Sequence, residues 1–239
     1  MVKGLKAKYH DEIKVFLSPR NSRKAEALRQ AFPDVRVMAS NQEVVDAAEW
    51  ILLAVLPDVA EDTVRALRFG PHHRVISLIS QPKLVDLAAW IGDCQSVCRV
   101  NPQTFIEFRN GPILLYPSHP KTYNLFTGLG QLIVTETEEA FILAQTLTCI
   151  MGPLYFLMDK IALWAQSHGL PAEQSVPFLE SMLSAMADYA ARNDPNHLAE
   201  LWKEVTPGGL NETAMRMIDR SGGNDAWIDA LEAVRKRIM

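Results

Sequence analysis

Short apolar runs alternate with helical patterns through the first half of this 239-residue chain, and this alternation constrains the fold more than any other feature. The runs "WILLAVL" (50–56) and "RVISLIS" (74–80) are apolar without a break, as strands covered on both faces of a parallel sheet are. Amphipathic helical patterns lie between such runs. The sequence therefore predicts an α/β fold with a doubly wound, Rossmann-like parallel sheet.

The pattern changes near residue 130. From Thr135 onwards the apolar residues recur at helical spacing, and no strand pattern is seen. Thr135 and Glu138 have the spacing of a capping box, and Gly169 followed by Pro171 is typical of a helix end. We predict an α/β domain over residues 1–130 and an all-α domain over residues 131–239.

Charge and composition narrow the classes of function. The formal net charge is −4 and there is no Lys/Arg block, which argues against a nucleic-acid or membrane-surface partner. No uninterrupted apolar run has the roughly 20 residues that cross a bilayer, and the first residues lack the apolar segment of a signal peptide. Cys94, Cys98 and Cys149 lack the spacing of metal ligands. We expect a cytoplasmic protein with reduced thiols and no metal site.

The stretch "LSPRNSRK" (17–24) follows the first predicted strand and is rich in hydrogen-bond donors. NAD-binding folds carry an acidic residue there for the ribose hydroxyls, whereas this stretch offers Ser18, Arg20 and Asn21 together with two more cations. Such donors suit a 2′-phosphate, and hence NADP. The alternative is a solvated basic helix start, but cations there oppose the helix dipole and a bound anion would explain them.

Another polar stretch, "EVTPGGLNETAM" (204–215), has the composition of an anion site. A proline fixes φ, two glycines remove the Cβ atoms, and a helical pattern follows. Unpaired N–H groups at a helix start stabilise negative charge. The alternative is a left-handed turn that caps a helix, which needs the same glycines.

One expected feature is absent from the sequence. No G-x-G-x-x-G follows a strand pattern in the first half. A dinucleotide-binding fold without that loop lacks the backbone donors that hold the pyrophosphate. We therefore expect weak binding of any dinucleotide.

Taken in order, these stretches resemble the pyrroline-5-carboxylate reductase family. "WILLAVLPD" resembles the family's strand that ends in A-V-K-P, and "CRVNPQTF" is similar to its R-V-M-P-N-T-P. "MGPLYFLMDKIALWAQSHGLP" resembles the G-S-G-P-A-Y helix, and "EVTPGGLNETAMRMI" resembles the S-P-G-G-T-T loop and the helix after it. The resemblance covers nearly the whole chain in one register. It implies NADPH-dependent reduction of pyrroline-5-carboxylate to proline by a dimer or higher oligomer built through the helical half.

The resemblance also implies roles for residues. Ser18 and Arg20 would face the adenosine phosphate, and Asn41 would touch the cofactor ribose. The segment on the nicotinamide side would comprise Ala54, Val55, Leu56 and Pro57. The substrate carboxylate would be received by Gly208, Gly209, Leu210 and Asn211. No residue is assigned as a catalytic acid, although Tyr155 is a candidate.

The sequence departs from the family pattern in several places. "MVKGL" matches the end of the family's first helix, so we expect the first strand and its glycine loop to lie upstream of Met1. Loss of that central strand would leave its two neighbours without ladder partners. Leu56 replaces the lysine of A-V-K-P, and Leu210 and Asn211 replace the two threonines.

Three functions stay open on the sequence. The first is the NADPH-dependent reductase, and the second is a non-catalytic dimeric relative that binds a small carboxylate without cofactor. The third is another enzyme of the β-hydroxyacid-dehydrogenase class, which needs a substrate-facing lysine in the helical half. Lys160 is the candidate for that role, and a solvated surface lysine is the alternative.

Overall fold

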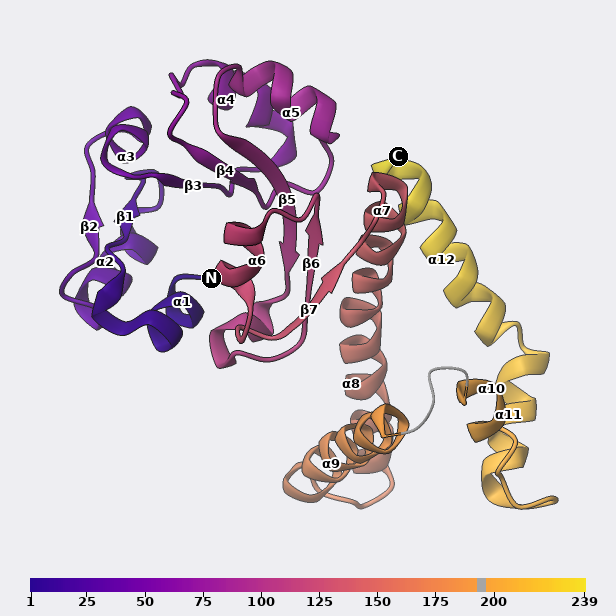
Figure 1. Ribbon diagram of the computed structural model, residues 1–239. Coiled ribbons are helices and arrows are strands. Elements are labelled where there is room, and N and C mark those ends of the chain that lie inside the picture. The colour runs from indigo at the N-terminus through magenta and orange to yellow at the C-terminus, as the bar shows by residue number, and fades with distance from the viewer. Residues whose placement is uncertain (193–196) are drawn as a thin grey trace. The chain divides into compact units, whose positions relative to one another are not determined.

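The computed structural model describes residues 1–192 and 197–239 (Figure 1). These residues form two compact units, one of Met1–Thr146 with Arg237–Met239 and the other of Leu147–Lys236. All strands of the described residues belong to the first unit, and the second unit is helical. The predicted fold class is confirmed.

The first unit contains the alternating elements that the sequence predicts, although the strands are short. Its strands are β1 (Phe16–Leu17), β2 (Arg36–Val37), β3 (Trp50–Leu53), β4 (Arg74–Ser77), β5 (Ser96–Pro102), β6 (Pro112–Tyr116) and β7 (Gln131–Val134). Its helices are α1 (Val2–Tyr9), α2 (Ser22–Ala31), α3 (Asn41–Ala47), α4 (Ala60–Arg65), α5 (Leu84–Ile91), α6 (Pro120–Phe126) and α7 (Glu138–Leu147, to Thr146 in this unit). Short 3-10 helices lie at His10–Glu12, Pro57–Val59, Thr104–Phe108 and Thr148–Ile150.

The strands form two separate sheets. One contains β1 and β2, and the other has the order β3-β4-β5-β6-β7. Within residues 1–192 and 197–239, strands β1 and β3 each pair with a neighbour on one side only. All pairs are parallel except β5 and β6, an antiparallel pair that the sequence did not predict. Only residues 103–111 join those two strands, too few for the crossover that a parallel pair requires.

Apolar clusters cover both faces of the larger sheet. The neighbouring residues Val75 and Ile76 of β4 are both fully buried, and they belong to different clusters because side chains alternate along a strand. One cluster gathers Ile76, Cys98 and Phe126, and the other gathers Val75 with residues of α3, α4 and α5. Burial on both faces explains why the strand sequences are continuously apolar.

The second unit consists of α8 (Met151–Ser167), α9 (Ala172–Ala191), α10 (Leu198–Leu201), α11 (Leu210–Arg220) and α12 (Gly223–Ile238). Many of its large apolar side chains are exposed, among them Phe156, Trp164 and Phe178, each by more than 60%. An exposed apolar surface of this extent is typical of an interface for another protein chain.

One helical stretch, Glu138–Ser167, is long and apolar enough to cross a membrane by length and composition, although only 22% of its most apolar part is buried. The sequence contains no uninterrupted apolar run of this length, but the mean hydropathy of this stretch is high enough for a membrane span. A helix whose apolar face binds another protein has the same composition.

Two predicted helix ends can be compared with the structure. The capping box at Thr135 and Glu138 is wrong, because the hydroxyl of Thr137 accepts the Ala140 amide and Glu138 pairs with Arg99 instead. Gly169 ends α8 with a φ of 94°, and the Leu170 amide donates to the carbonyl of Ala165. That predicted helix end is confirmed.

Candidate functional site

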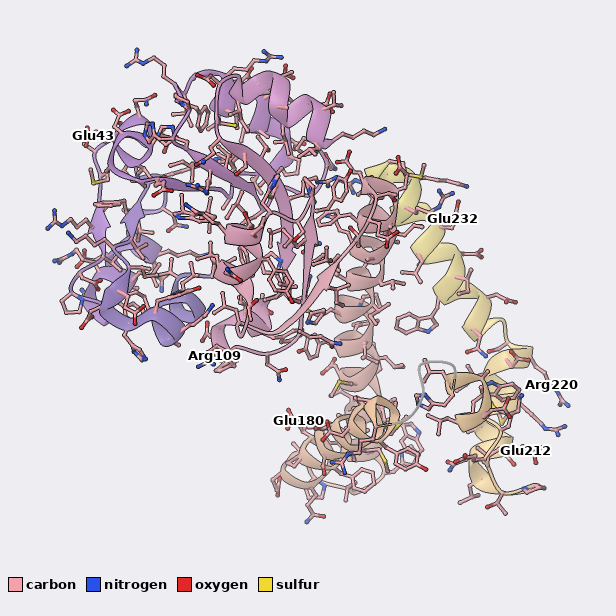
Figure 2. All side chains as sticks on the ribbon, in the orientation of Figure 1. Glu43, Arg109, Glu180, Glu212, Arg220 and Glu232 are labelled. Atoms are coloured by element: carbon pink, nitrogen blue, oxygen red, sulfur yellow. The ribbon has the colours of Figure 1, made fainter. Side chains whose placement is uncertain are left out.

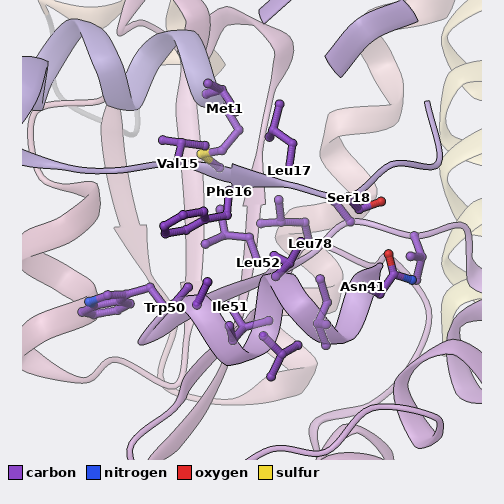
Figure 3. A pocket seen from close by; sticks show the side chains of 18 of the residues that line it. Met1, Val15, Phe16, Leu17, Ser18, Asn41, Trp50, Ile51, Leu52 and Leu78 are labelled. Carbon is purple, nitrogen blue, oxygen red and sulfur yellow. The ribbon is translucent and has the colours of Figure 1, made fainter. Parts of the chain in front are cut away.

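A cavity of about 1150 Å³ opens within the first unit between β1 and β3 (Figure 3). Residues 15–18 form one wall and residues 50–55 form the other, and side chains of α1, α3 and α4 contribute to the lining. Most of these side chains are apolar. At the carboxyl ends of both strands the lining becomes polar, with Ser18 and Asn41 (Figure 3). Ligands of open α/β sheets bind beyond the carboxyl ends of the strands.

The structure brings five of the eight predicted cofactor residues to this cavity. Its lining includes Ser18, Arg20, Asn41, Ala54 and Val55. The cavity is therefore continuous with the edge at which we predicted the cofactor.

The other three predicted cofactor residues do not line the cavity. Asn21 caps α2 by accepting the Lys24 amide at 3.0 Å. Leu56 is 66% exposed, and Pro57 begins a 3-10 turn. The side chain of Asn21 is therefore committed to the helix start.

The cations at the start of α2 have no acidic partner in the described part of the chain. Arg20, Arg23 and Lys24 are exposed and make no ion pair there, whereas Arg29 on the same helix pairs with Glu26 at 2.7 Å. The N-terminal end of α2 adds positive potential to these charges. This edge is suited to a phosphate monoester such as the 2′-phosphate of NADP.

The same edge does not fit a pyrophosphate. The glycines of the first unit nearest in sequence to β1 and β3 are Gly4 and Gly70, and neither follows a strand. Gly4 lies in α1, where an added Cβ would come within 2.2 Å of the Ile106 carbonyl oxygen, so close packing explains this glycine. Residues 1–146 thus offer donors for the 2′-phosphate of a dinucleotide, but no glycine loop for its pyrophosphate.

The predicted carboxylate loop lies in the second unit, before α11. Gly208 has a φ of 74°, which only glycine adopts readily, and Gly209 is the N-cap residue. Leu210, the first residue of α11, is 91% exposed. The described residues provide no acceptor for the amides of Leu210 and Asn211.

Two amides of this loop already have acceptors within the protein. The Gly208 amide donates to the carboxylate of Glu212 at 2.5 Å, and the Gly209 amide donates to the carbonyl of Thr206 at 2.9 Å (Glu212 is labelled in Figure 2). The amide of Gly208, and next to it Arg216, keep the pKa of Glu212 below its usual value. The loop thus binds a carboxylate, that of Glu212 in the helix that follows it.

Sequence reasoning missed a buried polar network in the first unit. Arg99 on β5 is 1% exposed and donates to Glu138 at 2.7 Å and to the carbonyl of Ser80 at 3.0 Å. Glu138 also accepts the Leu84 amide at 2.7 Å, so it joins α7, α5 and β5. An arginine between two apolar residues, Cys98 and Val100, was the available signal, because a buried charge needs a partner.

Two remaining candidates receive no support from their surroundings. Tyr155 is 57% exposed, and the Lys160 ammonium lies 5.1 Å from the centre of the Phe156 ring on the same helix. No group of three or more His, Cys, Asp or Glu side chains in residues 1–192 and 197–239 could hold a metal ion. The three cysteines form no disulfide.

Comparisons with known proteins agree in both halves of the chain. A family model described as pyrroline-5-carboxylate reductase dimerisation matches residues 139–239, and one described as NADP oxidoreductase, coenzyme F420-dependent, matches residues 1–81. The pyrroline-5-carboxylate reductase of Glycine max is 26% identical over 225 residues, covering 88% of this chain and 81% of the relative. That of Pseudomonas aeruginosa is 27% identical over 214 residues, covering 85% and 78%. Over most of its length the chain is thus similar to pyrroline-5-carboxylate reductases.

Solved structures show the same fold. The pyrroline-5-carboxylate reductase of Streptococcus pyogenes has a TM-score of 0.85 at 15% identity, covering 99% of this chain and 93% of that one. The Plasmodium falciparum enzyme, solved with NADP bound, has a TM-score of 0.82 at 18% identity, covering 98% and 90%. The dimerisation model of the family lies over the segment that carries the exposed apolar surface, so the chain is a homo-oligomer.

Proposed function

We propose that the chain is a pyrroline-5-carboxylate reductase, which reduces pyrroline-5-carboxylate to proline with NADPH. The observation that carries the proposal is the set of exposed cations at the carboxyl end of β1, Arg20, Arg23 and Lys24, which lack acidic partners in the described chain. Matches in both halves to models of an NADP oxidoreductase and of the family's dimerisation segment support it. We place the reaction in the cytoplasm.

The cofactor supplies the hydride when it is bound, and the protein supplies position and charge. Ser18 and Arg20 hold the 2′-phosphate, with Arg23 and Lys24 adding positive potential. Asn41 binds the ribose, and residues 54–57 lie along the nicotinamide. Because the glycine loop is missing from residues 1–239, we propose that this binding is weak.

The substrate carboxylate is received by the loop at Gly208 to Asn211. The amides of Leu210 and Asn211 are available to it, and the amide of Gly208 becomes available when Glu212 turns away. An amide side chain at Asn211 donates to a carboxylate as a threonine hydroxyl does. The dimerisation domain, which we place at residues 131–239, assembles the chain into a homodimer.

Purified protein mixed with NADPH and pyrroline-5-carboxylate tests the proposal through the loss of reduced-nicotinamide absorbance. We expect slow turnover that is raised by higher NADPH concentration. Arg20→Ala should weaken NADPH binding about tenfold while leaving NADH binding nearly unchanged, since a guanidinium–phosphate bond is a strong charge-assisted one. The matched control Arg29→Ala removes an exposed arginine of the same helix and should change neither.

The second candidate is a non-catalytic dimer that binds a small carboxylate without cofactor. The missing glycine loop and the absence of an assigned catalytic acid favour it. Proline binding with no oxidation of NADPH at any concentration would establish this candidate and refute the reductase.

A further inference from the structure

Two side-chain amides lie next to each other where β5 ends. Gln103, just beyond the strand, donates from its Nε2 to the Oδ1 of Asn101 at 3.1 Å, and both residues are partly exposed. Within residues 1–192 and 197–239, the Nδ2 of Asn101 and the Oε1 of Gln103 have no hydrogen-bond partner. The pair therefore presents one free donor group and one free acceptor to a ligand. The family pattern R-V-M-P-N-T-P has Met in place of Asn101, so this pair is a departure from it.

The strand register places this pair on the same edge of the sheet as the predicted cofactor residues. Leu53 of β3 pairs with Ser77 of β4, and Ser77 pairs with Arg99 of β5. Two residues further along β3 and β5 lie Val55, which lines the cavity, and Asn101. Because neighbouring strands are about 4.8 Å apart, Asn101 lies roughly 10 Å from Val55 along this edge.

A dinucleotide that binds at the cavity extends along this edge. Dinucleotides lie across the crevice of a doubly wound sheet, with one nucleotide on each side. The cations that suit the 2′-phosphate follow β1, on one side of the cavity. The nicotinamide nucleotide then lies on the other side, over the carboxyl ends of β3, β4 and β5. Strand β5 is the last of this parallel run, because its neighbour β6 is antiparallel.

The neighbouring strand ends offer fewer free polar groups. Residues 54–57, after β3, are Ala, Val, Leu and Pro. After β4, the carbonyl of Ser80 is occupied, since it accepts from Arg99 at 3.0 Å and from Gln145 at 3.2 Å. Gln81 adds a single side-chain amide there. The hydrogen-bonded amide pair at the end of β5 is thus the best match for a ligand group that both donates and accepts.

We propose that Asn101 and Gln103 bind the carboxamide of the nicotinamide ring, an inference that rests on the proposed function. The Nδ2 of Asn101 donates to the carboxamide oxygen, and the Oε1 of Gln103 accepts from the carboxamide NH2. A carboxylate in the same place has no donor for that Oε1, which disfavours the acid group of the substrate there. Holding the carboxamide fixes the rotation of the ring, and hence the face of the ring that is turned toward the substrate.

Two oxidised cofactors that differ only at the carboxamide test this contact. NADP carries the NH2 group, and 3-acetylpyridine adenine dinucleotide phosphate has a methyl group in its place. We expect calorimetric titration of the unmodified protein to give about tenfold weaker binding of the analogue, because the Oε1 of Gln103 is left without a donor. Adenosine 2′,5′-bisphosphate, which lacks the nicotinamide half, is the reference ligand. None of these measurements depends on reductase activity.

Variants of the pair assign the contact to its two residues. Gln103→Leu should bind NADP and the analogue equally, whereas Asn101→Leu should weaken both by about tenfold. Both variants should bind adenosine 2′,5′-bisphosphate as the unmodified protein does, which shows that the fold and the phosphate edge are intact. Gln81→Leu is the matched control, since it removes an amide from the neighbouring strand end, and it should keep the preference for NADP.

Equal binding of NADP and the analogue by the unmodified protein would overturn the proposal, as would a preference that survives in Gln103→Leu. Loss of the preference in Gln81→Leu alone would overturn it by assigning the carboxamide to the end of β4. In each of these cases the cofactor still binds, so the proposed function stands. Absence of binding of both NADP and adenosine 2′,5′-bisphosphate would overturn the proposed function together with this inference.

Discussion

The carboxylate of Glu212 accepts the backbone amide of Gly208, four residues earlier, at 2.5 Å. This is the amide that we expect to meet the carboxylate of the substrate. Arg216, four residues later, donates to the same side chain at 2.5 Å. The carboxylate of Glu212 is therefore held by one group before it and one group after it in the sequence. The glutamate thus serves as an internal competitor for the loop, and the loop's geometry already accommodates a carboxylate.

Replacing Glu212 with alanine should therefore strengthen proline binding. The change frees the Gly208 amide and removes a negative charge beside the loop, and we expect a several-fold gain in affinity by calorimetric titration. Glu232→Ala is the matched control, since Glu232 also pairs with an arginine but lies on α12 away from the loop. Weaker proline binding in Glu212→Ala would show that the residue serves only to hold the loop in shape.

The protein as residues 1–239 should bind NADPH with a dissociation constant weaker than micromolar. We expect the cations at the start of α2 to contact one phosphate, but no glycine loop of residues 1–239 contributes amides to the pyrophosphate. Isothermal titration measures this directly, and a micromolar or tighter constant would contradict it. Raising the salt concentration should weaken the binding further, because its main contribution comes from exposed charges.

Removal of Glu138 should destabilise the first unit. Arg99 would keep its charge while buried, and its guanidinium would be left with the Ser80 carbonyl and Gln145 as polar contacts. We expect Glu138→Ala to cost about 3–5 kcal/mol of unfolding free energy in urea. Glu139→Ala, which removes an exposed acid from the same first turn of α7, should cost less than about 0.5 kcal/mol. Equal losses of unfolding free energy in the two variants would show that an acid at the helix start, and not the pair with Arg99, provides the stability.

Stability should fall as the pH drops below about 6.5, the ordinary pKa of histidine. His73 is buried and accepts the Gly70 amide at 2.8 Å on Nδ1, so it is neutral with its proton on Nε2, beside the Val45 carbonyl. Burial, and secondarily His72, lower its pKa in the folded state. The unfolded chain then binds more protons below pH 6.5, so acid favours unfolding.

Urea midpoints measured from pH 8 to pH 5 test this dependence. His73→Gln should have a lower urea midpoint than the unchanged protein at pH 8. Its midpoint should fall less than that of the unchanged protein between pH 8 and pH 5. An unchanged slope in that variant would assign the decrease to other groups.

The homo-oligomer should dissociate when the exposed apolar surface of α8 acquires charge. Trp164 is 64% exposed, and we expect Trp164→Glu to lower the measured mass to that of the monomer in analytical ultracentrifugation at micromolar concentration. Val85→Glu changes a residue that is 70% exposed in the first unit and should leave the mass unchanged. Dissociation in both variants would indicate a non-specific effect of charge.

Local sequence patterns predicted much of the fold because strands, helices and helix ends depend mainly on residues that are close in sequence. The alternation of "WILLAVL" and "RVISLIS" with helical segments predicted the order of strands and helices, and Gly169 marked the end of α8. The antiparallel β6 and the cap at Thr137 were not predicted. Strand direction depends on the connection between strands, and the choice of cap depends on where Glu138 finds a better partner.

The candidate site divides in the same way. Donor-rich stretches after a strand and before a helix are visible in the sequence, and five of the eight predicted cofactor residues do lie together at one cavity. The competition of Glu212 for Gly208 was not foreseen, because a glutamate at that position also reads as an ordinary first-turn acid.

The sequence by itself determined the class of fold, the order of the elements and the resemblance to a family, since hydrophobic periodicity and short motifs act over a few residues. Only the tertiary structure decided that β1 and β3 stand apart with bare edges, that Arg99 is buried against Glu138, and that the loop amides are partly occupied. These features depend on groups distant in sequence meeting in space, where unpaired main-chain groups and buried charges must find partners.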